Sequence, residues 1–147
     1  MSRENVELSR VYHDEIGRVS REGPDSEATA SKMVSKMAEF WDPEVEYDMS
    51  AFEGPDIGGV YRGIAACRHF WREWFVAWET LQFEYELVDA GNRVVVLLDL
   101  RLRGRSTGIE VPFGKHAFVS TFRDGLVVHA KLYMSQSEAL EAVGLSE

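Results

Sequence analysis

The chain has a single cysteine, Cys67, among 147 residues, so it forms no internal disulfide and no zinc site built from several thiolates. It also lacks an apolar run near the ~18 residues that a membrane-spanning helix needs. Its first ten residues, MSRENVELSR, have no apolar segment of the kind found in signal peptides. These absences favour a cytoplasmic protein.

Basic residues are scarce relative to acidic ones. The 16 lysines and arginines face 25 aspartates and glutamates, which gives a formal charge of −9. Because phosphate groups bind basic surfaces, we expect neither a nucleic acid nor an anionic membrane as a partner. The four histidines are widely separated and form no H-x-x-x-H pair, so no metal site is predicted.

The composition is otherwise that of an ordinary globular protein, with 45% hydrophobic and 28% charged residues. The length is typical of one domain, and we expect a single domain over residues 1–147. Four tryptophans are many for this length. Three of them fall in one predicted helix over residues 64–79, whose wide apolar face should enter the core.

Apolar periodicity predicts two further helices in the first third of the chain, over residues 2–17 and from Asp25 to about residue 42. A short strand over residues 44–49 follows. The second half alternates between apolar and polar residues, which predicts long strands. Asp124-Gly125 is typical of a two-residue hairpin turn, and Ser135 with Glu138 forms a capping box before a last short helix.

Helices therefore come first and antiparallel strands follow, an order typical of an α+β fold. If Asp124-Gly125 is the turn, directly opposed residues on the final hairpin have numbers that sum to 249. Val119 then faces Ala130, and Ala117 faces Leu132. These small or apolar residues are the predicted inner set, whereas His116 and His129 should lie on the outer face. A bulge that changes the register would reverse this assignment.

Three segments together resemble the SnoaL-like proteins of the nuclear transport factor 2 superfamily: FWDPEVEYD, YRGIAACRHFWREWF and FRDGLVVHAKLYMSQSEALEAVGL. The resemblance implies a cone-shaped, strongly curved, mostly antiparallel sheet wrapped around three helices, with a short C-terminal helix. It also implies a pocket inside the cone, no cofactor, and a homodimer formed through the outer sheet face. Members include isomerases, polyketide cyclases, dehydratases, epoxide hydrolases and proteins without known activity.

Resemblance to the ketosteroid isomerases of that superfamily places a catalytic base on Asp48 and an oxyanion donor on Tyr12. Glu46 shares a strand face with Asp48. Val45 and Tyr47 occupy the opposite face, so the alternation could equally bury those two and expose both acids. The positions of other family acids hold residues that cannot transfer a proton, namely Phe118 or Val119, and Leu132.

Two tryptophans, Trp41 and Trp71, could line a flat apolar ligand at the mouth of the cone, beside Val119, Ala130 and Leu132. Arg62, just before the third helix, could fix an anionic or carbonyl group. His13 should point away from the apolar stripe of its helix.

Three functions remain open. The first is a cofactor-independent isomerase, cyclase or dehydratase acting on a small apolar carbonyl compound. The second is a non-catalytic binding module for a small apolar molecule. The third is a structural dimer whose pocket is filled by its own tryptophans.

Overall fold

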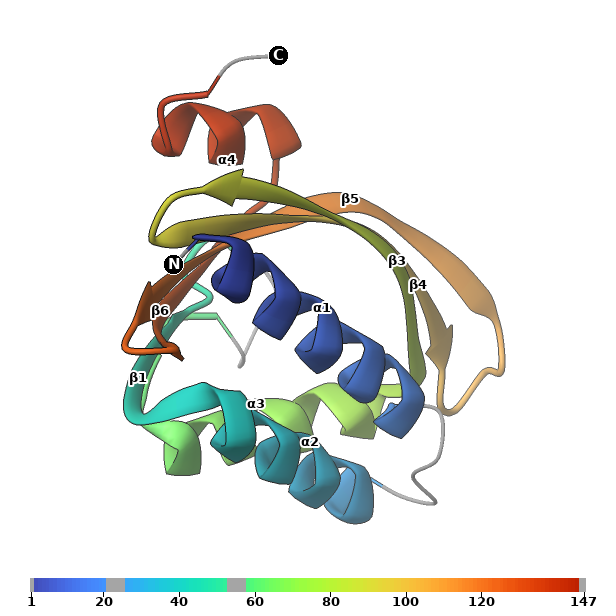
Figure 1. Cartoon of the computed structure of the whole chain (residues 1–147). Coiled ribbons are helices and arrows are strands. Elements are labelled where there is room, and N and C mark those ends of the chain that lie inside the picture. The colour runs from blue at the N-terminus through green and yellow to red at the C-terminus, as the bar shows by residue number, and fades with distance from the viewer. Residues whose placement is uncertain (1, 21–25, 53–57, 146–147) are drawn as a thin grey trace.

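The computed structural model describes residues 2–20, 26–52 and 58–145. They form four helices and one six-stranded mixed sheet, which confirms the predicted α+β class (Figure 1). The strands lie in the order β2-β1-β6-β5-β4-β3, with β1 and β6 parallel and every other pair antiparallel. The elements are α1 (Ser2–Val19), α2 (Ser26–Phe40), β1 (Trp41–Asp48), β2 (Val60–Arg62), α3 (Ile64–Ala77), β3 (Trp78–Ala90), β4 (Arg93–Gly104), β5 (Glu110–Arg123), β6 (Leu126–Tyr133) and α4 (Gln136–Ala142).

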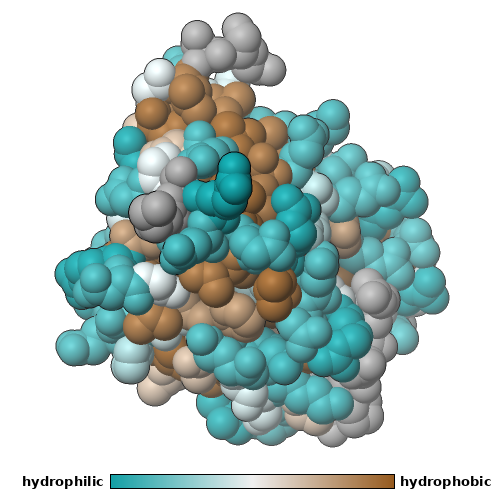
Figure 2. Space-filling view, in the orientation of Figure 1, coloured by the Kyte–Doolittle hydropathy of each residue, from teal (hydrophilic) through white to brown (hydrophobic). Residues whose placement is uncertain are grey.

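The sheet is strongly curved, and α1, α2 and α3 lie on its concave side (Figure 1). The main hydrophobic core fills the space between these helices and the concave face. α4 lies on the convex side, where a second, smaller cluster joins Ala139 to Val95, Ala117 and Val119. Hydrophilic side chains cover most of the face seen in Figure 2, with apolar atoms gathered below α4 and near the middle.

The predicted alternation of the long strands is confirmed. Phe83 pairs with Leu100 and Tyr85 with Leu98; Leu98 is buried in the main core, and the other three side chains are partly buried and pack against it. Residues between them point to the convex side, because successive side chains of a strand alternate between its two faces. A run of apolar residues at every second position is therefore enough to decide which side of β3 and β4 is covered by helices.

The final hairpin follows its predicted register only near the turn. Asp124 and Gly125 have the positive φ angles of the predicted turn, 53° and 80°, and Phe122 pairs with Val127. The register then shifts by one residue, so that Val119 pairs with Lys131. The prediction that Val119 lines the pocket is wrong, because this bulge turns it to the convex face beneath α4.

The same bulge decides where two histidines lie. Ser120 pairs with Ala130 and Phe118 with Leu132, and these pairs face the concave side. His116 shares that face, against the prediction, because it lies two residues from Phe118 on the same strand. His129 lies on the convex face as predicted, with Nε2 3.4 Å from a carboxylate oxygen of Glu46.

Element boundaries differ from the prediction at a few places. α1 continues past Gly17 to Val19, and Trp41 opens β1 instead of closing α2. The short strand β2 was not predicted, and Asp25, the predicted start of the second helix, lies outside the described residues. The cap of α4 is confirmed, since the Ser135 hydroxyl accepts a hydrogen bond from the Glu138 backbone N–H at 3.3 Å. None of the helices in the described part of the chain is long and apolar enough to span a lipid bilayer.

Side-chain hydrogen bonds fix α1 along the sheet. Near its C-terminal end, the buried Ser20 hydroxyl lies 2.8 Å from the Leu81 carbonyl oxygen on β3. In the middle of the helix, the Tyr85 hydroxyl donates to a carboxylate oxygen of Asp14 at 2.5 Å. Because these contacts are spread along the helix, they set its rotation as well as its distance from the sheet.

Replacing Ser20 with alanine should lower the free energy of unfolding by about 1–2 kcal/mol, because the Leu81 carbonyl would lose its buried partner. Urea unfolding followed by circular dichroism measures this change. The exposed Ser106→Ala variant is the matched control and should stay within about 0.5 kcal/mol of the wild type. Equal stability of the two variants would contradict an anchoring role for Ser20.

Candidate functional site

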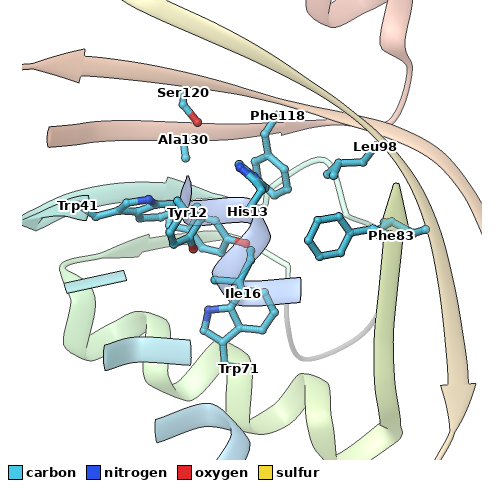
Figure 3. Close-up of a pocket in the computed structure, with 12 residues that line it drawn as sticks. Tyr12, His13, Ile16, Trp41, Trp71, Phe83, Leu98, Phe118, Ser120 and Ala130 are labelled. Atoms are coloured by element: carbon cyan, nitrogen blue, oxygen red, sulfur yellow. The ribbon is translucent and has the colours of Figure 1, made fainter. Parts of the chain in front are cut away.

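Two small chambers lie inside the concave side of the sheet. The first has a volume of about 50 Å³ and lies between α1 and the strands, as Figure 3 shows. The second, of about 60 Å³, lies toward α3 and the bend of β5. The first is lined by Tyr12, His13, Ile16, Trp41, Tyr47, Trp71, Phe83, Leu98, Leu100, Phe118, Ser120 and Ala130. The second is lined by Tyr47, Met49, Phe52, Phe70, Trp71, Trp74, Leu98, Leu100, Phe113, His116, Phe118 and Leu132.

An aromatic pair separates the two chambers. The rings of Tyr47 and Phe118 stack at 5.7 Å with an angle of 9° between their planes, and both rings line both chambers. Trp71 completes the shared wall from α3, and its indole N–H points to the Met37 sulfur at 3.1 Å. The division therefore consists of side chains alone, so rotation of a side chain could change it.

α1 brings two polar side chains to the first chamber, Tyr12 and His13. Both are buried and line the chamber, and Figure 3 shows them on α1. Burial raises the pKa of Tyr12 well above its usual value, and it does the same for Tyr47 across the chamber. Both hydroxyls therefore stay protonated at any physiological pH and can act as hydrogen-bond donors.

The prediction that His13 points away from the apolar stripe of its helix is wrong, because its side chain is buried and lines the first chamber. Its Nδ1 lies 2.7 Å from the carbonyl oxygen of Ser9, one turn earlier in α1. Burial lowers the pKa of His13 to about 4, against smaller raising effects of the Ser9 bond and of Asp14. The imidazole is therefore neutral at pH 7. The spacing of Ser9, His13 and Ile16, at i, i+4 and i+7, places the three on one side of the helix and is a signal for this position.

Most of the predicted binding residues reach the chambers. Trp41, Trp71 and Ala130 line the first chamber together with Tyr12, and Leu132 lines the second. Arg62 lies elsewhere. It is exposed on β2, and its guanidinium forms an ion pair with Glu46 at 2.7 Å.

Asp48 does not face either chamber, contrary to the expectation that made it a base. In the strand pairing it stands opposite Lys131, on the convex side, while Tyr47 points inward. Its carboxylate accepts hydrogen bonds from the backbone N–H and the hydroxyl of Ser50, at 2.9 and 2.6 Å. Partial burial favours a higher pKa, but the hydrogen bonds from Ser50 and the nearby Lys131 and His129 outweigh this effect, and the pKa of Asp48 is lowered. Asp48 points outward because side chains alternate along β1, and the apolar residues Val45 and Tyr47 take the inner face.

The walls of both chambers are uncharged. None of the described residues that line them is an aspartate, glutamate, lysine or arginine. Their polar groups are hydroxyl, imidazole and indole groups, and the indole N–H of Trp74 in the second chamber has no acceptor among the described residues. Nor does the described part of the chain gather three histidine, cysteine or carboxylate side chains that could hold a metal ion. The arrangement can enclose an apolar molecule and hydrogen-bond to it.

Comparison with known sequences identifies the family. Residues 26–130 match a sequence model of the SnoaL-like domain, which is more than half of the chain. The chain belongs to the SnoaL-like domain family. No protein with a curated description is significantly similar to it in sequence.

Solved structures agree with this SnoaL-like assignment. An NTF2-like protein of unknown function from Burkholderia pseudomallei has a TM-score of 0.69 at 18% identity, covering 95% of this chain and 97% of that one. TerC, co-crystallised with polyporic acid, gives 0.70 at 15% identity, covering 96% and 98%. A protein named as a SnoaL-like polyketide cyclase, from Jannaschia sp. CCS1, gives 0.70 at 18% identity, covering 99% and 95%. At such identities the likeness shows a common fold, the NTF2-like fold that the sequence predicted.

Burial of neutral His13 should make stability depend on pH. The unfolded chain binds a proton at this site with a pKa near 6.5, and the folded chain only near 4. The stabilising contribution is therefore complete above about pH 6.5 and falls by about 3 kcal/mol as the pH drops to about 4. Chemical unfolding of the wild type and His13→Phe from pH 4 to 7 measures the difference. Aspartates and glutamates titrate in both proteins, so an unchanged difference between them across this range would contradict the buried neutral state.

Proposed function

We propose that this SnoaL-like protein binds a small, uncharged and mainly apolar ring compound between α1 and the concave face of its sheet. The observation that carries the proposal is the composition of the two chamber walls. They combine apolar and aromatic side chains with a few neutral hydrogen-bonding groups, which is the usual make-up of a small-molecule pocket.

The absence of charge among the described wall residues restricts the ligand. Moving an ion into an apolar cavity without a charged partner costs several kcal/mol, so a carboxylate or ammonium ligand gains nothing here. A neutral oxygen fits better, because Tyr12 and Tyr47 offer protonated hydroxyls to an acceptor such as a carbonyl. The binding-module hypothesis therefore has more support than an isomerase, cyclase or dehydratase that uses Asp48 as its base.

The size of the chambers also restricts the ligand. Each is smaller than the roughly 150 Å³ cavity that accommodates benzene in a protein core. A ring compound therefore needs both chambers, joined by a shift of Tyr47 or Phe118. A homodimer formed through the outer sheet face and a cytoplasmic location stay predictions beside this proposal.

Toluene, anisole or phenol should stabilise the protein saturably, by about 1.4 kcal/mol at ten times the dissociation constant. Calorimetric titration and thermal unfolding measure the affinity and the shift. Ala130→Val adds two methyl groups to the first chamber and should weaken binding severalfold. Ala117→Val makes the same change on the convex face and should not. If none of the three compounds stabilises the wild type, the pocket-binding function is excluded and a structural role replaces it.

Removing the shared wall should enlarge the pocket. Phe118→Ala joins the two chambers, so toluene should bind more tightly although the free energy of unfolding falls by about 2–4 kcal/mol. Phe122→Ala is the matched control, because Phe122 lies on the same strand and face but lines neither chamber. Equal toluene affinity in the two variants would mean that the Phe118 ring does not limit the space.

A further inference from the structure

We propose that Nε2 of His13 is the hydrogen-bond acceptor of the first chamber, and that the ligand carries a neutral hydroxyl group, a phenol or an enol, that donates to it. The inference rests on the proposed function and narrows the class of ring compound. It starts from a buried side chain on the chamber wall whose two ring nitrogens have different roles.

The hydrogen bond within α1 fixes the tautomer of His13. A carbonyl oxygen can only accept, so Nδ1, at 2.7 Å from the Ser9 oxygen, must carry the proton. In a neutral imidazole the other nitrogen is then an acceptor with a free lone pair. Among the described residues, no group donates a hydrogen bond to Nε2.

The direction of Nε2 follows from the ring. The two nitrogens point to nearly opposite sides of an imidazole, so with Nδ1 turned toward its own helix, Nε2 points away from the backbone of α1. Aromatic rings hold the imidazole on its other sides, at 5.1 Å from Tyr12, 6.2 Å from Phe83 and 5.4 Å from Tyr85 between ring centroids. Both His13 and Ser120 line the first chamber, and both are labelled in Figure 3.

The remaining polar groups of the chamber call for a ligand that both donates and accepts. Tyr12 and Tyr47 are donors and His13 is the complementary acceptor, while Ser120 can serve in either role. A phenol or enol oxygen accepts from a tyrosine hydroxyl and donates its own proton to Nε2. Anisole, the methyl ether of phenol, can only accept, so it leaves Nε2 unpaired.

The test compares phenol, anisole and toluene on the full chain. Phenol should bind the wild type about threefold to tenfold more tightly than anisole, the effect expected of one buried neutral hydrogen bond. In His13→Phe, which keeps a flat ring without nitrogens, phenol should bind no more tightly than anisole. The nitrogen NMR signal of His13 Nε2 should shift with phenol but not with toluene, while the Nε2 signals of His69 and His129 should stay in place.

Two results separate the inference from the proposed function. If anisole and toluene bind but phenol is no tighter, or if the Nε2 signal does not move, the role of His13 is overturned and the apolar pocket stands. If none of the three compounds binds, the proposed function fails and the inference falls with it. Should His13→Phe not fold, the ligand series and the NMR signal of the wild type decide the question alone.

Discussion

The pleat of a β-sheet requires directly paired residues to share a face, and this requirement builds the inner wall of the protein. One row crosses four strands, from Val94 through Ser120 and Ala130 to Tyr47. All four side chains are buried. Because each member of the row fixes the side on which its partner lies, a single apolar residue on β4 determines which groups reach the interior from β5, β6 and β1.

Helix α1, on the concave side, supplies polar side chains that the inner rows of the sheet mostly lack. The inner rows of the sheet are mostly apolar, whereas α1 contributes a phenol and an imidazole that are both held in the uncharged state. Burial is the cause in each case, because an apolar surrounding disfavours the charged form. Without charges in its described walls, the interior can hydrogen-bond to an occupant and still keep an apolar character. The Tyr85 and Ser20 contacts give α1 the rotation that this arrangement needs.

The parts of the fold that depend on local patterns were predictable. Alternation along β3 and β4, the Asp124-Gly125 turn and the Ser135 cap each have a physical cause within a few residues, and each is present. The bulge in the final hairpin has no such local cause. It shifts the pairing by one residue beyond Phe122, so that Val119 lies outside the pocket and His116 lies on the inner face.

The candidate site was harder to predict because its geometry, like the bulge, depends on more than local sequence patterns. Tyr12, Trp41 and Trp71 were found because large aromatic residues at helical spacing enter the core. His13 was predicted to point away from the apolar stripe because histidine is polar, and hydropathy does not register that the Ser9 carbonyl binds its Nδ1–H inside the helix. Family resemblance placed Asp48 in the pocket as a base. The alternation of β1 turns it outward instead, since Val45 and Tyr47 are buried and Asp48 is not.

The lone cysteine has a consequence of its own. Cys67 is fully buried on α3 at the centre of the core, and burial raises the pKa of its thiol to about 12. A thiolate-seeking reagent can reach it only when α3 separates from α2 and the sheet. The rate at which such a reagent labels Cys67 in the native protein therefore reports how often the core opens. No engineered cysteine is needed for this measurement.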